Sequence, residues 1–120
     1  MSSENEDCPV DLDWLRECTD DDPEAMRTMA NLYVTRTTTQ LVELESAIAR
    51  NAALDVHKIA HGCVGSSGTC GMTKIAVVFK ELEKMGKAGE LAGAGALSEQ
   101  ARAEFERIKA FLTEKKISGS

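Results

Sequence analysis

The chain has 120 residues and a formal net charge of -6, a length that fits one domain and leaves no room for a second catalytic domain. No apolar run approaches the roughly 20 residues needed to span a bilayer, so we expect no membrane association. The acidic balance argues against nucleic acid as a partner, because binding to a phosphate backbone requires a basic surface.

The first eight residues are polar and acidic and lack the apolar core of a secretory signal. We expect residues 1–8 to be flexible and the protein to be cytoplasmic. The cysteines at positions 8, 18, 63 and 70 form no C-x-x-C pair and no zinc-finger spacing with histidine. They are therefore expected to be reduced thiols, and no metal site is predicted.

The first predicted elements are a short helix between Pro9 and Cys18 and a long helix that begins at Pro23. Asp22 is a candidate N-cap for the long helix, and proline is favoured at a first helical position. Apolar residues then recur at three- and four-residue intervals to about Arg50, across threonines 37–39 that have poor helix propensity. This pattern predicts one uninterrupted amphipathic helix.

Three further helices are predicted after a break at Asn51. The first spans about residues 52–70 and ends at Gly71, and the second spans about residues 72–87. The segment 89–97 contains three glycines and is expected to be a connection, after which Ser98 caps a last helix that reaches about residue 116. Residues 117–120 look frayed.

No segment shows the alternation typical of strands, and no internal repeat is visible. We therefore predict an all-α fold, an antiparallel up-down-up-down four-helix bundle with a short N-terminal helix, over residues 9–116. Four helices can enclose their own core, so a monomer is expected.

The helix predicted over residues 52–70 carries a face that does not look like core. At about 100° per residue, Val56, Ile59, Cys63 and Cys70 lie opposite His61, which should therefore be exposed. Gly65 and Gly68 share the side of His61, although each glycine inside a helix costs about 0.5–1 kcal/mol relative to alanine. Close approach of another molecule would explain them, and packing between helices is the alternative.

Residues 60–72 read AHGCVGSSGTCGM. This string closely resembles the signature of histidine-containing phosphotransfer (HPt) domains, commonly A-H-x-L-K-G-S-S-x-x-x-G-A. The resemblance extends to residues 15–26, which resemble the entry into the first long helix of the family, and to Leu82-Glu83-x-x-Gly86 in the following helix. It covers roughly residues 10–115, which is nearly the whole chain.

The resemblance implies a bundle whose exposed histidine accepts a phosphoryl group from an aspartyl phosphate of one receiver domain and passes it to another. By position, that histidine is His61. The resemblance also implies that the receiver supplies Mg²⁺, that this chain needs no cofactor, and that its partners are response-regulator receiver domains and a hybrid histidine kinase. No glycine-rich nucleotide loop is present in the sequence, so no kinase activity is expected.

One position departs from the family pattern. Val64 stands where the family usually has lysine, whose charge can support the phosphoryl group. Lys58 lies within about 60° of His61 on the helical wheel and could partly substitute. Glu83 falls where the family often places a polar residue close to the histidine, and could orient the imidazole through a hydrogen bond.

The wheel also places Leu54, Val64 and Met72 within about 60° of His61, which makes them candidates for an apolar docking patch. His57 is expected to flank this patch. His57 and His61 could form a metal-binding pair, but no third ligand is patterned. Two other functions remain open: a pseudo-HPt adaptor that binds a receiver or a histidine kinase without carrying phosphate, and a helical interaction module with no link to signalling.

Overall fold

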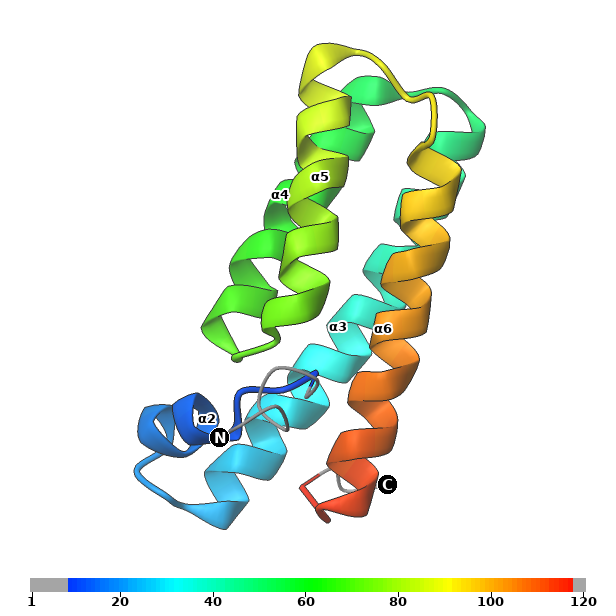
Figure 1. Cartoon of the computed structure of the whole chain (residues 1–120). Helices are drawn as coiled ribbons and strands as arrows, with labels where there is room; N and C mark the ends of the chain where they lie inside the picture. The colour runs from blue at the N-terminus through cyan, green and yellow to red at the C-terminus, as the bar shows by residue number, and fades with distance from the viewer. Residues whose placement is uncertain (1–8, 118–120) are drawn as a thin grey trace, which may run out of the picture.

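The computed structural model describes residues 9–117, and all its regular elements within this range are α-helices. The helices are α2 (Leu12–Cys18), α3 (Pro23–Ala49), α4 (Ala53–Thr69), α5 (Thr73–Ala88) and α6 (Ala94–Glu114). Helices α3 to α6 alternate in direction and form the predicted up-down-up-down bundle (Figure 1). The two long helices α3 and α6 extend past the shorter α4–α5 pair, and α2 lies beside α3 at that end (Figure 1).

The ends of the helices follow local signals in the sequence. The Asp22 carboxylate accepts a hydrogen bond of 3.1 Å from the Glu24 amide, and Pro23 is the first residue of α3. Helix α3 continues through the three threonines because Thr37 is buried within the apolar stripe. Asn51, Gly71 and Gly89 have φ of 56°, 78° and 75°, and these left-handed residues lie just beyond the C-terminal ends of α3, α4 and α5.

The start of α6 differs from the prediction. The helix begins at Ala94, so the connection is shorter than residues 89–97, and Ser98 lies inside the helix. Gly93 turns the chain with φ 87°, and the buried Ala94 and half-buried Leu97 extend the core-facing stripe before Ser98. The Ser98 hydroxyl caps no helix terminus and donates to the Gly95 carbonyl at 3.1 Å.

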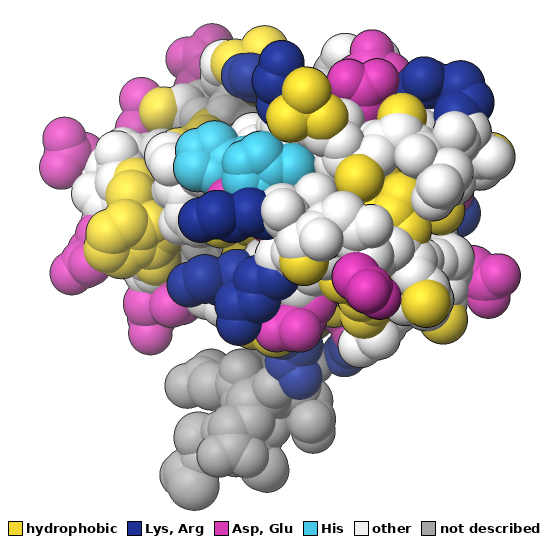
Figure 2. All heavy atoms as spheres, turned by 90° about the horizontal axis from the view of Figure 1, so that it is seen from above, with side chains coloured by type: hydrophobic (Ala, Val, Ile, Leu, Met, Phe, Trp, Pro, Cys, Tyr) yellow, Lys and Arg dark blue, Asp and Glu magenta, His cyan; other side chains and the backbone are white. Residues whose placement is uncertain are grey.

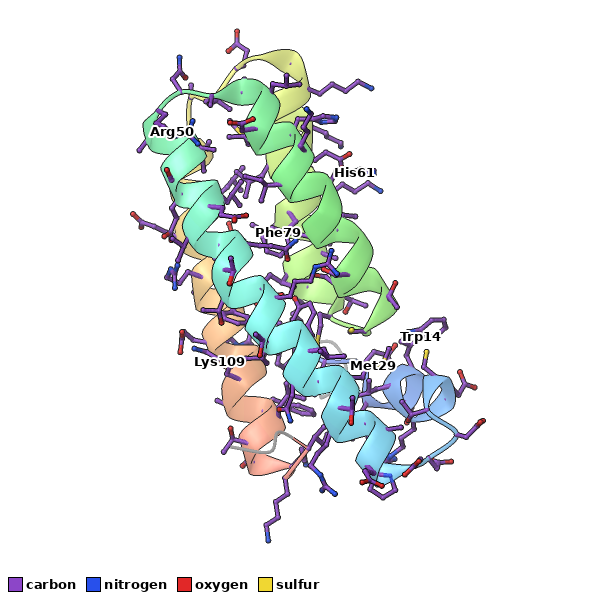
Figure 3. All side chains as sticks on the ribbon, turned by 180° about the vertical axis from the view of Figure 1, so that it is seen from behind. Trp14, Met29, Arg50, His61, Phe79 and Lys109 are labelled. Atoms are coloured by element: carbon purple, nitrogen blue, oxygen red, sulfur yellow. The ribbon has the colours of Figure 1, made fainter. Side chains whose placement is uncertain are left out.

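The buried apolar residues form one core cluster, which also contains polar side chains. Phe79 and Phe105 are its largest fully buried side chains, and Phe79 points into the bundle in Figure 3. The Tyr33 and Ser67 hydroxyls lie 2.8 Å apart in a buried hydrogen bond between α3 and α4. This bond explains why a serine is tolerated on the buried side of α4.

Helix α2 is fastened to the end of α4. The Asp11 amide donates to the Gly71 carbonyl at 2.7 Å, and the Trp14 indole N–H donates to the Thr69 carbonyl at 3.0 Å. These bonds satisfy carbonyls at a helix terminus that would otherwise lack partners. The helix that carries His61 is thereby held at its C-terminal end.

The chain after α6 packs back onto the bundle. Ile117, expected in a frayed terminus, is buried, and its amide donates to the Leu112 carbonyl at 2.9 Å. The flexible segment expected at residues 1–8 and the rest of the frayed end, residues 118–120, lie outside the described residues. Within the part of the chain that the structure describes, no helix is both long and apolar enough to cross a membrane.

Candidate functional site

His61 lies on the outer face of α4, near the middle of the helix. Its side chain is 74% exposed, and it points away from the bundle interior in Figure 3. The opposite face of α4 supplies Val56, Ala60 and Cys63 to the core, which is why the sequence turns the imidazole outward. The histidine is therefore available to a second macromolecule without any change in the fold.

Glu83 of α5 holds one edge of the imidazole. The Glu83 Oε2 atom lies 2.7 Å from His61 Nδ1, and the Glu83 side chain is only 21% exposed. A carboxylate accepts hydrogen bonds and does not donate them, so Nδ1 carries the proton. The lone pair of neutral His61 is then on Nε2, the nitrogen on the exposed side of the ring.

His57 lies one turn before His61, and both rings are fastened to the same residue of α5. The His57 Nδ1 atom is 3.4 Å from the Glu83 carbonyl oxygen, and the two ring centroids are 6.3 Å apart with a tilt of 30°. Figure 2 shows the two histidine side chains side by side at the surface, next to Lys or Arg side chains. The site thus contains two imidazoles.

Lys58 and Val64 occupy different environments. Lys58 is exposed, and among the described residues it makes no ion pair or hydrogen bond. Val64, at the position of the family lysine, is half-buried and packs against the core. The structure therefore leaves Lys58 at the surface without a partner among the described residues and gives Val64 a packing role.

Open space lies beside Gly65 and Gly68. Both residues are exposed, and a Cβ atom added to either would meet no atom within 4 Å. Neither glycine is required for packing between the described helices, which removes the alternative explanation of their presence. Leu54, two turns before His61, is 64% exposed, as expected for a surface patch.

Met72 was wrongly placed on that patch, because it is fully buried in the core. The wheel drawn for α4 does not extend to this residue. The helix ends at Thr69, Gly71 reverses the chain with φ 78°, and Met72 is the non-helical residue before α5. The turn directs its side chain inward.

A groove between α3 and α4 was not predicted. It has a volume of about 370 Å³ and begins at Gly62 and Gly65, beside His61. The wall on α3 is formed by Met29, Leu32, Tyr33 and Arg36. Leu32 is 67% exposed and lies off the buried stripe of its helix, which is the one sequence signal that could have indicated the groove.

No cluster of three or more potential metal ligands occurs in residues 9–117, so the histidine pair lacks a third ligand there. The thiols near the site are also inert. Burial raises the pKa of Cys63 to about 12 and also raises the pKa of Cys70. Neither thiol forms a reactive thiolate near neutral pH.

Known proteins share the fold and the sequence pattern of this chain. The chain is similar to the crystal structure of histidine-containing phosphotransfer protein B (HptB) from Pseudomonas aeruginosa PAO1, with a TM-score of 0.84 and 25% sequence identity. The similarity covers 89% of this chain and 93% of that chain. No curated protein sequence matches the chain. The sequence pattern of the Hpt domain matches residues 28–111, and the chain therefore belongs to the Hpt domain family.

Proposed function

We propose that this protein is a phosphocarrier in which His61 accepts a phosphoryl group from the aspartyl phosphate of one receiver domain and donates it to another. The observation that carries the proposal is the contact of 2.7 Å between Glu83 Oε2 and His61 Nδ1 on an exposed helix face. A hydrogen bond that fixes the ring and its tautomer is what a nucleophilic imidazole requires.

Because Glu83 engages Nδ1, Nε2 is the attacking atom in this proposal. Its lone pair forms a bond to phosphorus while the bond between phosphorus and the aspartyl oxygen breaks, and the electron pair of that bond leaves with the carboxylate. The ring, still protonated at Nδ1, becomes cationic, and the Glu83 carboxylate stabilises this charge. Donation to the next receiver is the reverse sequence with a second aspartate.

The partner domain is proposed to supply the rest of the chemistry. A transferred phosphoryl group needs charge stabilisation on its equatorial oxygens, and Mg²⁺ commonly provides it. We place Mg²⁺ in the receiver, so that this chain contributes nucleophile, positioning and docking surface. Since its sequence contains no glycine-rich nucleotide-binding motif, we expect the kinase activity of the relay to come from a partner.

Gly65 and Gly68 let the receiver approach the backbone of α4 beside the nucleophile. We assign to the docking surface the exposed Leu54 and the groove lined by Leu32 and Arg36. For such a phosphorelay we propose a cytoplasmic monomer that meets receiver domains and a hybrid histidine kinase.

The test is incubation with a receiver domain carrying radiolabelled aspartyl phosphate, in the presence of Mg²⁺. Acid-labile label is expected on the wild type and absent from His61→Gln. The matched control is His57→Gln, which keeps His61 and should reach a similar end point. Label that persists in His61→Gln contradicts the assignment of His61.

Absence of label on the wild type, together with receiver binding, would favour the pseudo-HPt adaptor, which Val64 in place of lysine keeps as the second candidate. The proposal for Lys58 is tested in the same assay. If Lys58→Ala leaves both the transfer rate and the lifetime of the phosphohistidine unchanged, Lys58 does not replace the family lysine.

A further inference from the structure

We propose that His57 is a second functional residue of this site, which binds the phosphoryl group carried by His61 through a protonated imidazole. This inference rests on the proposed phosphocarrier function. It addresses how the chain stabilises a phosphoryl group although Val64 replaces lysine.

The backbone and ring of His57 are held in place by α5. A Cβ atom at Gly86 would lie 2.5 Å from the His57 backbone nitrogen, so the two helices are in direct contact at this residue. The ring is partly buried, and its Nδ1 lies 3.4 Å from the Glu83 carbonyl oxygen. A carbonyl only accepts, so Nδ1 is the donor and the second ring nitrogen, Nε2, is unused.

The two unused nitrogens point in a common direction. His57 and His61 both turn Nδ1 towards Glu83, and their ring planes differ by 30°. Their Nε2 atoms therefore both lie on the edge away from α5. A phosphoryl group on Nε2 of His61 extends a few ångströms from the ring, which brings its oxygens within reach of a ring whose centroid is 6.3 Å away.

A side chain on an α-helix covers the turn that precedes its own Cα, so the His61 ring lies over the turn that contains His57 and Lys58. The same lean directs residue 64 back towards His61, where the valine side chain packs against the core and carries no charge. His57, with its ring centroid 6.3 Å from that of His61, can supply the charged contact that Val64 lacks.

The charges around His57 determine when it can donate. On α4 the titratable groups beside it are its sequence neighbour Lys58 and His61, whose ring centroid is 6.3 Å away. On α5 they are Glu83, whose backbone carbonyl contacts His57 and whose carboxylate contacts His61, and Lys87 one turn further along that helix. Neutral His57 has only a lone pair at Nε2 and would repel phosphoryl oxygens. When His57 takes up a proton from solvent, Nε2–H donates a charge-assisted hydrogen bond to the phosphoryl group.

The experiment compares transfer rates from a phosphorylated receiver at saturating concentration, from pH 8 to pH 6. The ratio of the wild-type rate to the His57→Gln rate should rise to about tenfold at pH 6 and approach one at pH 8. Both proteins keep His61 and Glu83, so protonation of the nucleophile affects both rates and leaves the ratio to report His57. His57→Arg, with a permanent charge, should give a ratio to His57→Gln that is constant with pH.

Lys58→Gln is the matched control, because it removes a neighbouring lysine charge and leaves both histidines in place. The ratio of the wild-type rate to the Lys58→Gln rate should not vary with pH. A His57→Gln ratio of one at every pH overturns the proposal. A ratio above one that is constant with pH also overturns it, because loss of packing alone would produce that result. Failure of the wild type to accept label refutes the phosphocarrier function itself, so the two failures are distinguishable.

Discussion

Gly86 of α5 and His57 of α4 are in contact where no side chain would fit. A Cβ atom at residue 86 would lie 2.5 Å from the His57 nitrogen and 2.8 Å from both the His57 Cα and the Ala53 carbonyl oxygen. The same approach of the two helices brings Glu83, one turn earlier on α5, to His61 Nδ1. A glycine in the core thus positions the carboxylate of the site.

Gly86→Ala is therefore expected to separate α5 from α4 and to destabilise the protein by about 1–3 kcal/mol, the usual cost of overpacking. Phosphoryl transfer should slow as well, because Glu83 moves away from His61. Urea unfolding and transfer from a labelled receiver measure the two effects. A variant with unchanged stability and rate would show that the helices accommodate the methyl group without moving.

The sequence predicted most helix ends correctly because the signals there are local. Asp22 and Pro23 start α3, and Asn51, Gly71 and Gly89 take left-handed conformations that end helices. Ser98 misled the prediction, since a serine preceding an apolar pattern is typical of a cap. The actual start of α6 depends on burial of Ala94, which only tertiary packing determines.

The site was predictable on one helix and less so between helices. The wheel of α4 placed His61, Gly65 and Gly68 outward, but failed for Met72, beyond the turn. The approach of Glu83 to His61 was expected only from resemblance, since it depends on how α4 packs against α5. The groove was missed for the same reason. Leu32 and Gly65 lie on different helices, and the sequence alone does not show which sides of α3 and α4 face each other.

Residue 71 must be glycine for two reasons, its backbone conformation and the atoms packed against it. Its φ is 78°, and a Cβ atom would lie 3.0 Å from the Asp11 carbonyl oxygen and 3.1 Å from Trp14 Cδ1. Gly71→Ala should therefore cost about 2 kcal/mol or more and displace α2. Trp14 is the only tryptophan, so its fluorescence reports that displacement directly.

Gly89→Ala is the control for this prediction, because Gly89 has a similar φ of 75° but open space around the missing Cβ atom. Gly89→Ala should lower the free energy of unfolding only by the cost of the left-handed backbone, about 1 kcal/mol, and leave the tryptophan fluorescence unchanged. Equal losses in the two variants would mean that the contact with α2 contributes nothing to stability.

The buried thiol and phenol predict sensitivity to alkaline pH. Burial raises the pKa of Cys63 from 9.0 to about 12 and also raises that of Tyr33. Between pH 9 and pH 12 the Cys63 thiol keeps its proton in the folded state and releases it in the unfolded state. Its contribution to stability is therefore intact below pH 9 and falls as pH rises towards 12. The slope reaches about 1.4 kcal/mol per pH unit for each group.

Urea unfolding at pH 8, 9 and 10 measures this loss. Cys63→Ala removes one titrating group and should flatten the decline, whatever its effect on absolute stability at pH 8. A decline that is equally steep in Cys63→Ala would mean that another group controls alkaline unfolding.

The groove predicts a docking effect that does not involve the chemistry. Leu32 lines it and is 67% exposed, so Leu32→Ser should leave stability nearly unchanged. Transfer at subsaturating receiver should fall roughly tenfold, with a smaller effect at saturation, because the lost contact is made equally in the ground and transition states.

Val42→Ser is the control: Val42 lies on the same helix, is 57% exposed and does not line the groove. Equal behaviour of the two variants would exclude the groove from the docking surface.

Gly65 predicts opposite changes in stability and function. It lies inside α4, and a Cβ atom added there would meet no atom within 4 Å, as is also true of Gly95 in the first turn of α6. Alanine at residue 65 should therefore stabilise the protein by about 0.5–1 kcal/mol, through helix propensity and reduced freedom of the unfolded chain. Alanine at residue 95 should act in the same direction, mainly through the unfolded chain. In the proposed docking mode, only the methyl group at residue 65 lies in the path of the receiver towards His61. Gly65→Ala should then slow transfer roughly tenfold, since displacement of the reacting groups by about 1 Å is costly, while Gly95→Ala transfers at the wild-type rate. A Gly65→Ala variant that is more stable and equally fast would show that the receiver does not approach the α4 backbone at this residue, and the open space would need another explanation.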